Sequence, residues 1–250
     1  MKNFSLCAAC LLSSLIMFGC SDDSSANKQL AEAVTKAKQG NWESAENIAE
    51  NLSEQYPKSP APMLLRSLAF EKNGDLVKAT DIARKCTEIT PDDFTAQYTL
   101  GRLYSRDPQR HAEAFSTLER ALALKPGDPD TLILLCNLGI IRKEPVTDKY
   151  LNLLKQNPGF SKSAELNFML GYRQAEQRNY EASKRFMMEA LNYSGGIGNH
   201  DFIYSIAHCF DQHNFPKKTT VQFYRLYIQA AGQKDQAKVN MVKKRLQQLR

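Results

Sequence analysis

The sequence predicts an all-α fold built from a row of helical hairpins. Residues 40–45 (GNWESA) recur as residues 74–79 (GDLVKA), 34 positions later, and Pro57 and Pro91 are separated by the same interval. Such a period is typical of stacked helix–turn–helix units. Because each hairpin buries its apolar face against the next copy, the stack presents an extended, curved surface and not a closed catalytic pocket. We therefore expect a binding function.

The first three pairs have the clearest apolar periodicity and turn residues. Residues 26–59 turn at Gly40-Asn41 and place apolar side chains inward at Leu30, Ala33, Val34, Ala37, Ala45, Ile48, Ala49 and Leu52. Residues 60–93 turn at Gly74-Asp75, with Met63, Leu64, Ser67, Phe70, Ala79, Ala83 and Cys86 inward. Residues 94–128 have one extra turn residue near Pro108, with Leu100, Gly101, Tyr104, Ala114, Leu118 and Ala121 inward.

A weaker fourth pair, a clearer fifth pair, a weaker sixth pair and a closing helix follow. Residues 129–158 keep Leu132, Leu135, Cys136 and Ile140, then Tyr150, Leu151 and Leu154 after Pro145. Residues 164–197 recover the pattern with Leu170, Gly171, Tyr180, Ser183, Met187 and Ala190, and residues 200–231 keep Phe202, Ile206, Cys209, Phe210, Val221, Tyr224 and Tyr227. One repeat domain over 27–233 is expected, closed by a capping helix within 234–250 whose inward side chains are Ala237, Met241, Val242, Leu246 and Leu249.

The amino terminus has the features of a secretory signal. Lys2 precedes an apolar run from Phe4 to Phe18, which is too short to cross a bilayer as a helix. Gly19-Cys20 resembles the lipobox of bacterial lipoproteins, and this resemblance implies cleavage of residues 1–19 and lipidation of Cys20. Ordinary signal cleavage that leaves a free Cys20 is the alternative. Residues 20–26 are polar and are expected to form a tether.

Charge and cysteine usage limit the classes of function. The chain has a net charge of +6, and the stretch from Lys217 to Arg250 contains nine Lys/Arg against one Asp. This basic pole, with Lys238, Lys243, Lys244 and Arg245, could meet an anionic envelope polymer, or it could be the solvated face of a terminal helix. Nucleic acid is not an expected partner. Cys86 and Cys136 fall at positions that favour small core residues, although a bridge between them is an alternative.

The repeated residues resemble the tetratricopeptide repeat. Two copies carry its pattern, one at Leu100, Gly101, Tyr104, Ala114, Leu118, Ala121 and Pro126 and one at Leu170, Gly171, Tyr180, Ser183, Met187 and Ala190. The resemblance implies a right-handed superhelical solenoid of about six hairpins plus a C-terminal capping helix. It also implies a concave groove for a protein or peptide partner, lined by Leu64, Leu68, Tyr98, Arg102, Arg106, Asn137, Ile141, Phe168 and Tyr172. In the alternative, Tyr98, Phe168 and Tyr172 are packing residues.

Catalytic and metal-binding patterns are weak. His200, His208, His213 and Cys209 are close in sequence, but His208 and His213 are five apart and point about 140° away from each other on a helix. Residues 195–198 (GGIG) lack the strand and lysine of a nucleotide loop and are expected to form a helix terminus and connector. We expect no enzyme activity, no cofactor and no metal site.

Together these features predict a membrane-anchored scaffold that assists assembly of a cell-envelope complex. It resembles repeat lipoproteins that assist type IV pilus secretins, outer-membrane barrel insertion or murein hydrolase recruitment. Because Ser21 follows Cys20, the sorting rule of bacterial lipoproteins implies the periplasmic face of the outer membrane. The alternative function is an envelope-polymer binding protein that uses the basic pole to hold peptidoglycan or lipopolysaccharide.

Overall fold

The computed structural model describes residues 24–249, and this part of the chain forms helices and no strands. Its thirteen α-helices divide into two compact units, the first ending at Arg142 and the second beginning at Lys143. The expected all-α stack of hairpins with a closing helix is confirmed. The signal segment and Cys20 lie outside the described residues. Helix α2 begins at Ser24, so the last three residues of the expected tether are helical.

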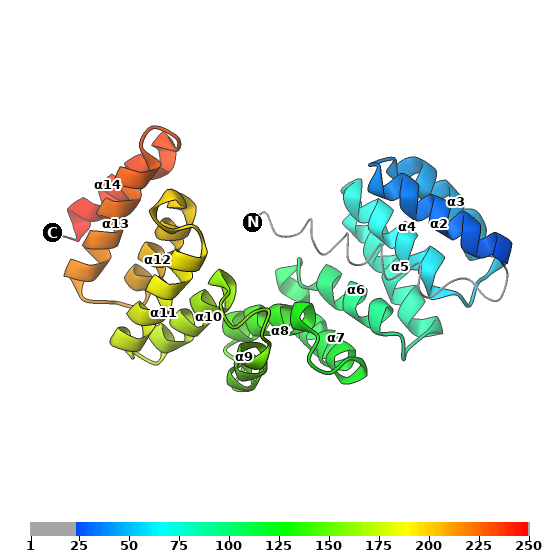
Figure 1. The fold of residues 1–250 in the computed structure, drawn as a ribbon, viewed down its shortest axis with the longest axis horizontal. Coiled ribbons are helices and arrows are strands. Elements are labelled where there is room, and N and C mark those ends of the chain that lie inside the picture. Colours follow the sequence, from blue (N-terminus) through cyan, green and yellow to red (C-terminus); the bar gives the residue numbers. More distant parts are fainter. Residues whose placement is uncertain (1–23, 250) are drawn as a thin grey trace. The chain divides into compact units, whose positions relative to one another are not determined.

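The first unit contains three hairpins and one further helix. In chain order these are α2 (Ser24–Lys38), α3 (Trp42–Gln55), α4 (Pro60–Lys72), α5 (Leu76–Ile89), α6 (Phe94–Tyr104), the 3-10 turn η1 (Pro108–Arg110), α7 (His111–Leu124) and α8 (Pro129–Arg142). Each helix packs against the next one in the sequence, as Figure 1 shows. The first helices of successive pairs also touch, because α4 contacts both α2 and α6. This order of contacts is that of a linear stack.

The second unit follows the same plan. Its elements are α9 (Thr147–Gln156), α10 (Ala164–Glu176), α11 (Tyr180–Tyr193), the 3-10 turn η2 (Gly196–Gly198), α12 (His200–Gln212), α13 (Lys217–Ala231) and α14 (Gln236–Gln248). Helices α10 and α12, the first helices of two successive pairs, contact each other. The closing helix α14 packs on α13. Within the described residues, no helix is long and apolar enough to cross a membrane.

The repeated Gly-Asn/Asp pair has a defined role at each early turn. Gly40 and Gly74 adopt φ of +85° and +86°, a left-handed conformation that glycine enters without steric cost. The next residue caps the second helix: the Asn41 side chain accepts a hydrogen bond from the Ser44 backbone N–H at 3.1 Å. Asp75 accepts one from the Lys78 backbone N–H at 3.0 Å. One glycine therefore ends a helix and its neighbour starts the next one.

Small residues let the two helices of a hairpin approach closely. A Cβ added at Gly101 of α6 would lie 2.7 Å from Leu118 Cγ of α7, and one added at Gly171 of α10 would lie 2.9 Å from Met187 Cγ of α11. Buried hydroxyls also join the two helices of a hairpin, at α4–α5 and at α10–α11. Ser67 Oγ donates to the Ala79 carbonyl at 2.8 Å, and Ser183 Oγ donates to the Gly171 carbonyl at 2.7 Å. The predicted role of the small residues is confirmed at both glycines.

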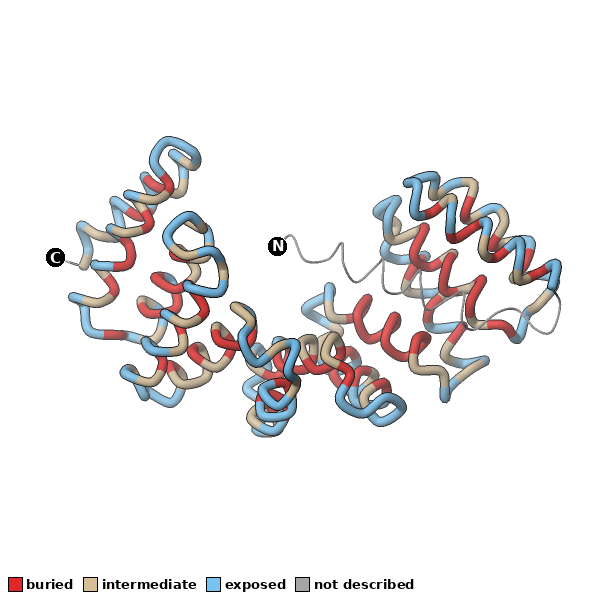
Figure 2. Tube along the Cα trace, viewed as in Figure 1, coloured by how far each residue is buried: buried red, intermediate tan, exposed pale blue. Residues whose placement is uncertain are grey.

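Aromatic residues fill much of the core of the second unit. Phe210 stacks on Phe215 with ring centroids 4.1 Å apart and meets Phe223 edge to face at 5.0 Å. Tyr227 is completely buried beside them. In Figure 2 the buried positions lie on the facing sides of neighbouring helices, while the turns are exposed. Large rings such as these supply apolar burial where the small-residue pattern of the earlier repeats is blurred.

The prediction for the inward face of the closing helix is wrong at two positions. Ala237 is exposed and Met241 is 51% exposed, whereas Val239 and Val242 are buried. Leu246 and Leu249 are half-buried, as part of the predicted face requires. Val239 and Val242 join the core cluster of this unit, and Lys238 and Arg245 form ion pairs with Asp201 and Asp211 of α12, so the packed face of α14 includes these side chains in place of Ala237 and Met241.

The three cysteines of the described residues are free, buried thiols, as the core interpretation predicts. The alternative disulfide between Cys86 and Cys136 is not formed. Burial raises the pKa of each thiol to about 12. They therefore act as small core residues with little thiolate at neutral pH.

Candidate partner-binding surface

In the first unit, a buried ion-pair cluster joins α4 to α6. The Arg102 guanidinium donates two hydrogen bonds to the Glu71 carboxylate, both at 2.6 Å, and Arg106 donates a third at 2.8 Å. Burial by itself would raise the pKa of Glu71, but the hydrogen bonds and charges of Arg102 and Arg106 outweigh it and hold that pKa below its ordinary value. Arg102 thus links two helices of the stack.

Four of the predicted groove residues are not exposed. Leu64 and Leu68 are each 2% exposed, and Tyr98 and Arg102 are each 4% exposed. Helix α6 is buried along nearly its whole length (Figure 2), since it packs against α5 and α7 and also touches α4. This corrects the expectation that these side chains line an open groove. The predicted contact of these four side chains with a partner stays a prediction.

The other predicted positions of this unit are more accessible. Arg106 remains partly exposed beside Glu71, Asn137 is exposed, and Ile141 is 62% exposed near the end of α8. Most of the Ile141 side chain is therefore accessible to solvent. In the first unit, therefore, the accessible part of the predicted groove consists of these three side chains.

In the second unit, partly exposed aromatic rings follow the first helix of each pair. Phe168 of α10 meets Phe202 of α12 edge to face, with centroids 5.5 Å apart. Tyr172, one turn later on α10, meets His213 at 4.8 Å. All four side chains are half-buried. Phe168 and Tyr172 therefore pack on neighbouring rings, as the alternative predicts, and both remain partly exposed. Their contact with a partner stays a prediction.

The sixth pair contributes residues that the sequence reasoning missed. Tyr204 and His208 of α12 stack with centroids 5.8 Å apart and repeat the spacing of Phe168 and Tyr172 thirty-six residues later. The sequence signal was a pair of aromatic rings separated by three residues, which recurs about one repeat length further along the chain. The loss of the glycine and leucine landmarks in this pair hid it. We call Phe168, Tyr172, Tyr204 and His208 the aromatic row.

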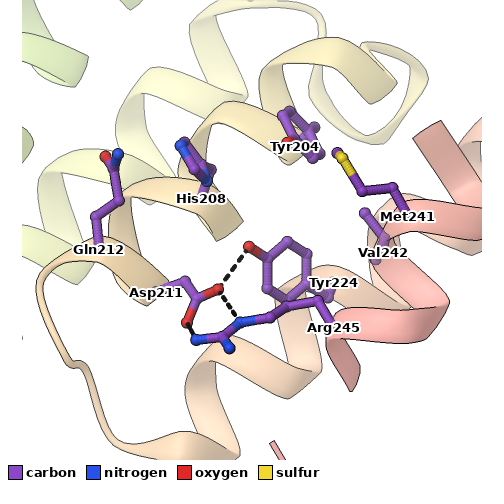
Figure 3. A pocket seen from close by; sticks show the side chains of 8 residues that line it. All are labelled: Tyr204, His208, Asp211, Gln212, Tyr224, Met241, Val242 and Arg245. Atoms are coloured by element: carbon purple, nitrogen blue, oxygen red, sulfur yellow. Dashed lines mark hydrogen bonds and ion pairs between the residues drawn. The ribbon is translucent and has the colours of Figure 1, made fainter. Parts of the chain in front are cut away.

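A pocket of about 320 Å³ opens beside the aromatic row. Helix α12 forms one wall and α14 the opposite wall, with α13 between them (Figure 3). It is lined by Tyr204, His208, Asp211, Gln212, Tyr224, Met241, Val242 and Arg245. The closing helix thus contributes to the candidate surface as well as covering the last apolar face.

A hydrogen-bonded network closes one end of this pocket, as the dashed lines in Figure 3 show. Arg245 donates to both Asp211 carboxylate oxygens, at 2.8 and 2.9 Å, and the Tyr224 hydroxyl donates to the same carboxylate at 2.9 Å. The Arg245 hydrogen bond lowers the pKa of Asp211, assisted by Tyr224, against the opposing effect of partial burial. Burial and the Asp211 carboxylate raise the pKa of Tyr224. The network is therefore an ionised carboxylate held by a cation and a neutral phenol.

The basic pole is partly neutralised. Lys238 Nζ lies 3.0 Å from Asp201 and 3.3 Å from Asp235, and Arg245 is paired as described above. Lys243 and Lys244 are exposed on α14. Of the four predicted pole residues, Lys238 and Arg245 thus dock the closing helix, which leaves the exposed positive surface of α14 to the other two.

The histidines and glycines singled out from the sequence do not assemble a reactive site. His208 is exposed within α12, whereas His213 lies just past its end. Burial lowers the pKa of His213. Within residues 24–249, no three metal-ligating side chains come together. Gly195 adopts φ of +100° one residue after Ser194, the C-cap of α11, which fits the expected helix terminus.

Comparisons with known proteins agree with the fold of stacked helical hairpins. The sequence pattern of the tetratricopeptide repeat family matches residues 30–93. No curated protein matches the chain. A tetratricopeptide repeat protein from Parabacteroides merdae ATCC 43184 has a similar structure, with a TM-score of 0.66 and 12% identity over 89% of this chain and 92% of that one.

Two further solved structures are similar. YrrB, described as a TPR protein with an unusual peptide-binding site, has a TM-score of 0.60 and 17% identity over 78% of this chain and 97% of its own. MamA from Desulfovibrio magneticus RS-1 has a TM-score of 0.59 and 17% identity over 69% of this chain and 96% of its own. Residues 30–93 therefore carry tetratricopeptide repeats, and the chain has the helical fold of tetratricopeptide-repeat proteins.

Proposed function

We propose that this protein is a membrane-anchored interaction scaffold that helps to assemble a cell-envelope complex by binding a protein or peptide partner. The observation that carries the proposal is the aromatic row, whose rings keep accessible edges on the first helices of successive pairs. Tyrosine, which supplies two of these four rings, is among the side chains most enriched at binding hot spots. The tetratricopeptide fold supports a scaffold role, and YrrB is an example with a peptide-binding site.

The anchoring part of the proposal rests on the amino-terminal sequence. Signal cleavage before Cys20 and lipidation of that residue would attach the first unit to the membrane through a very short tether. More than one acyl chain would give stable attachment. The proposed location is the periplasmic face of the outer membrane. Cys20→Ala should release the protein from the membrane fraction, and a variant that stays membrane-bound would contradict lipid anchoring.

A cross-linked pull-down tests the scaffold role. The lipidated protein, expressed in its native cell, is cross-linked and purified, and the recovered partner is identified. Tyr172→Ala should lower partner recovery, while Tyr193→Ala serves as the matched control because Tyr193 is 47% exposed on α11, outside the aromatic row. Thermal melting of both variants should match that of the parent protein. Equal recovery from the two variants would refute binding through the row.

The alternative, an envelope-polymer binding protein, has one specific observation in its favour. Residues 143–249 contain sixteen Lys/Arg against nine Asp/Glu, a net of +7, and Lys243 and Lys244 are exposed. Binding through these charges should weaken steeply as salt is added, because mobile ions screen exposed charges. Binding through aromatic rings should respond much less. A salt titration of binding to purified peptidoglycan separates the two functions.

A further inference from the structure

The pocket between α12 and α14 has features that specify the kind of partner. We propose that it binds one large apolar side chain of an acidic peptide segment in a partner protein. This inference rests on the proposed scaffold function and assigns a ligand chemistry to one place on its surface. The pocket lies at Tyr204 and His208, so a peptide held there would also follow the aromatic row.

The walls of the pocket favour an apolar group. Met241 is apolar yet 51% exposed, and it faces Tyr204 across the opening in Figure 3. Val242 and the Tyr224 ring complete the apolar lining. A methionine side chain adapts to ligands of different shape, because it is unbranched and polarisable. The volume of about 320 Å³ is at the lower limit of ligand pockets, which suits a side chain better than a cofactor.

The polar end of the pocket does not require a charged ligand. Asp211 is already bound by Arg245 and Tyr224, so its charge and its hydrogen-bonding oxygens are engaged within the protein. An apolar group that enters beside this network does not have to break it, and desolvation therefore costs little. His208 and Gln212 of α12 also line the pocket, and their polar atoms can bind a peptide backbone.

Charge around the pocket predicts the flanking residues of the peptide. Lys244 lies three residues after Met241 on α14, so the two side chains are neighbours on the helix surface. Lys243 is also exposed, but it is two positions after Met241 and lies on another side of α14. The described part of the second unit has a net charge of +7. Residues 24–142, in contrast, contain fifteen Lys/Arg against sixteen Asp/Glu. Asp or Glu beside the apolar anchor is therefore favoured specifically at this pocket.

Peptide display on the full chain, purified in detergent, tests the proposal. A library of random peptides should be enriched in sequences that contain Leu, Met or Phe next to Asp or Glu. The affinity of one enriched peptide is then measured by fluorescence anisotropy. Met241→Glu should weaken binding at least about tenfold, because it places a charge in the apolar wall and repels acidic residues. Met188→Glu is the matched control, since Met188 is 39% exposed on α11.

Several outcomes would overturn the proposal. One is enrichment of peptides without acidic residues, and another is equal binding when serine replaces the apolar anchor. The absence of any enriched peptide would also overturn it. Peptides that bind Met241→Glu normally but bind Tyr172→Ala weakly would refute the pocket and leave the scaffold function standing. Failure of the pull-down, with peptide binding intact, would instead refute the cellular role.

Discussion

Replacing Gly101 by alanine tests whether the hairpins depend on close backbone approach. The substitution puts a Cβ 2.7 Å from Leu118 Cγ, 2.9 Å from Leu118 Cδ2 and 3.2 Å from the Leu118 backbone nitrogen. Atoms at the branch point and on the backbone cannot move aside without shifting α7. Overpacking of this kind costs about 2 kcal/mol, within a usual range of roughly 1–3.

An opposing gain must be subtracted from this cost. Alanine is favoured over glycine by about 1 kcal/mol within a helix. The free energy of unfolding of the first unit should therefore fall by about 1 kcal/mol, where helix propensity alone predicts a rise of that size. Urea denaturation followed by circular dichroism measures the difference. A more stable Gly101→Ala protein would refute the packing argument.

Gly171→Ala is the matched comparison in the second unit. Its added Cβ would meet Met187 at 2.9 Å (Cγ), 3.1 Å (Cε) and 3.2 Å (Sδ), and the outer atoms of a methionine can rotate away. We expect a change close to zero. A double-mutant cycle of Gly101→Ala with Leu118→Ala adds a second test, because removing the Leu118 branch should relieve the clash and make the two effects non-additive.

Three further predictions concern ionisable groups. Arg102 and Arg106 hold the folded-state pKa of Glu71 below its ordinary 4.5, so the stability that Glu71 contributes is present above its unfolded-state pKa and is lost as pH falls through the folded-state value. Glu71→Gln should therefore flatten the fall in urea midpoint between about pH 6 and about pH 2. An unchanged slope would exclude Glu71 as a source of this pH dependence. Asp211→Asn should speed hydrogen exchange in α14 while the middle of α12 stays protected, and equal protection of α14 would show that the ion pair does not hold it. The buried thiols of Cys86, Cys136 and Cys209 should react with iodoacetamide slowly in the native protein and quickly in urea. Fast alkylation of the native protein would contradict their raised pKa.

The sequence predicted the hairpins well where glycine marks the turns. Gly40 and Gly74 occupy left-handed positions, and their spacing located the first two pairs. In later copies the same backbone conformation is adopted by Lys143, Arg178 and Asn214, with φ between 54° and 59°. Non-glycine residues at such positions leave no recognisable turn signal. The fifth pair was still recognised from Gly171 and its other small and apolar residues, whereas the fourth and sixth pairs, which have fewer of these landmarks, looked weak although their helices form.

Side-chain exposure was harder to predict than the helices themselves. Apolar periodicity cannot anticipate that Lys238 and Arg245 of α14 pair with acidic residues of α12, or that Met241 stays 51% exposed. It also cannot tell that Arg102 is held by a carboxylate thirty-one residues earlier in the chain. Both arrangements depend on contacts between helices that are distant in sequence, and charged residues carry no periodic pattern that would reveal them.

The two buried serine hydroxyls show how one contact can be built from either side. In the second hairpin the serine is on the first helix and the accepting carbonyl is on the second, and in the fifth hairpin this arrangement is reversed. The donor can therefore exchange places with its small counterpart without altering the alignment of the two backbones. A double substitution, of the serine and of the small residue opposite it, would therefore transfer the hydroxyl from one helix to the other. A search that requires serine at one fixed position would overlook hairpins in which the same hydrogen bond is donated from the other helix.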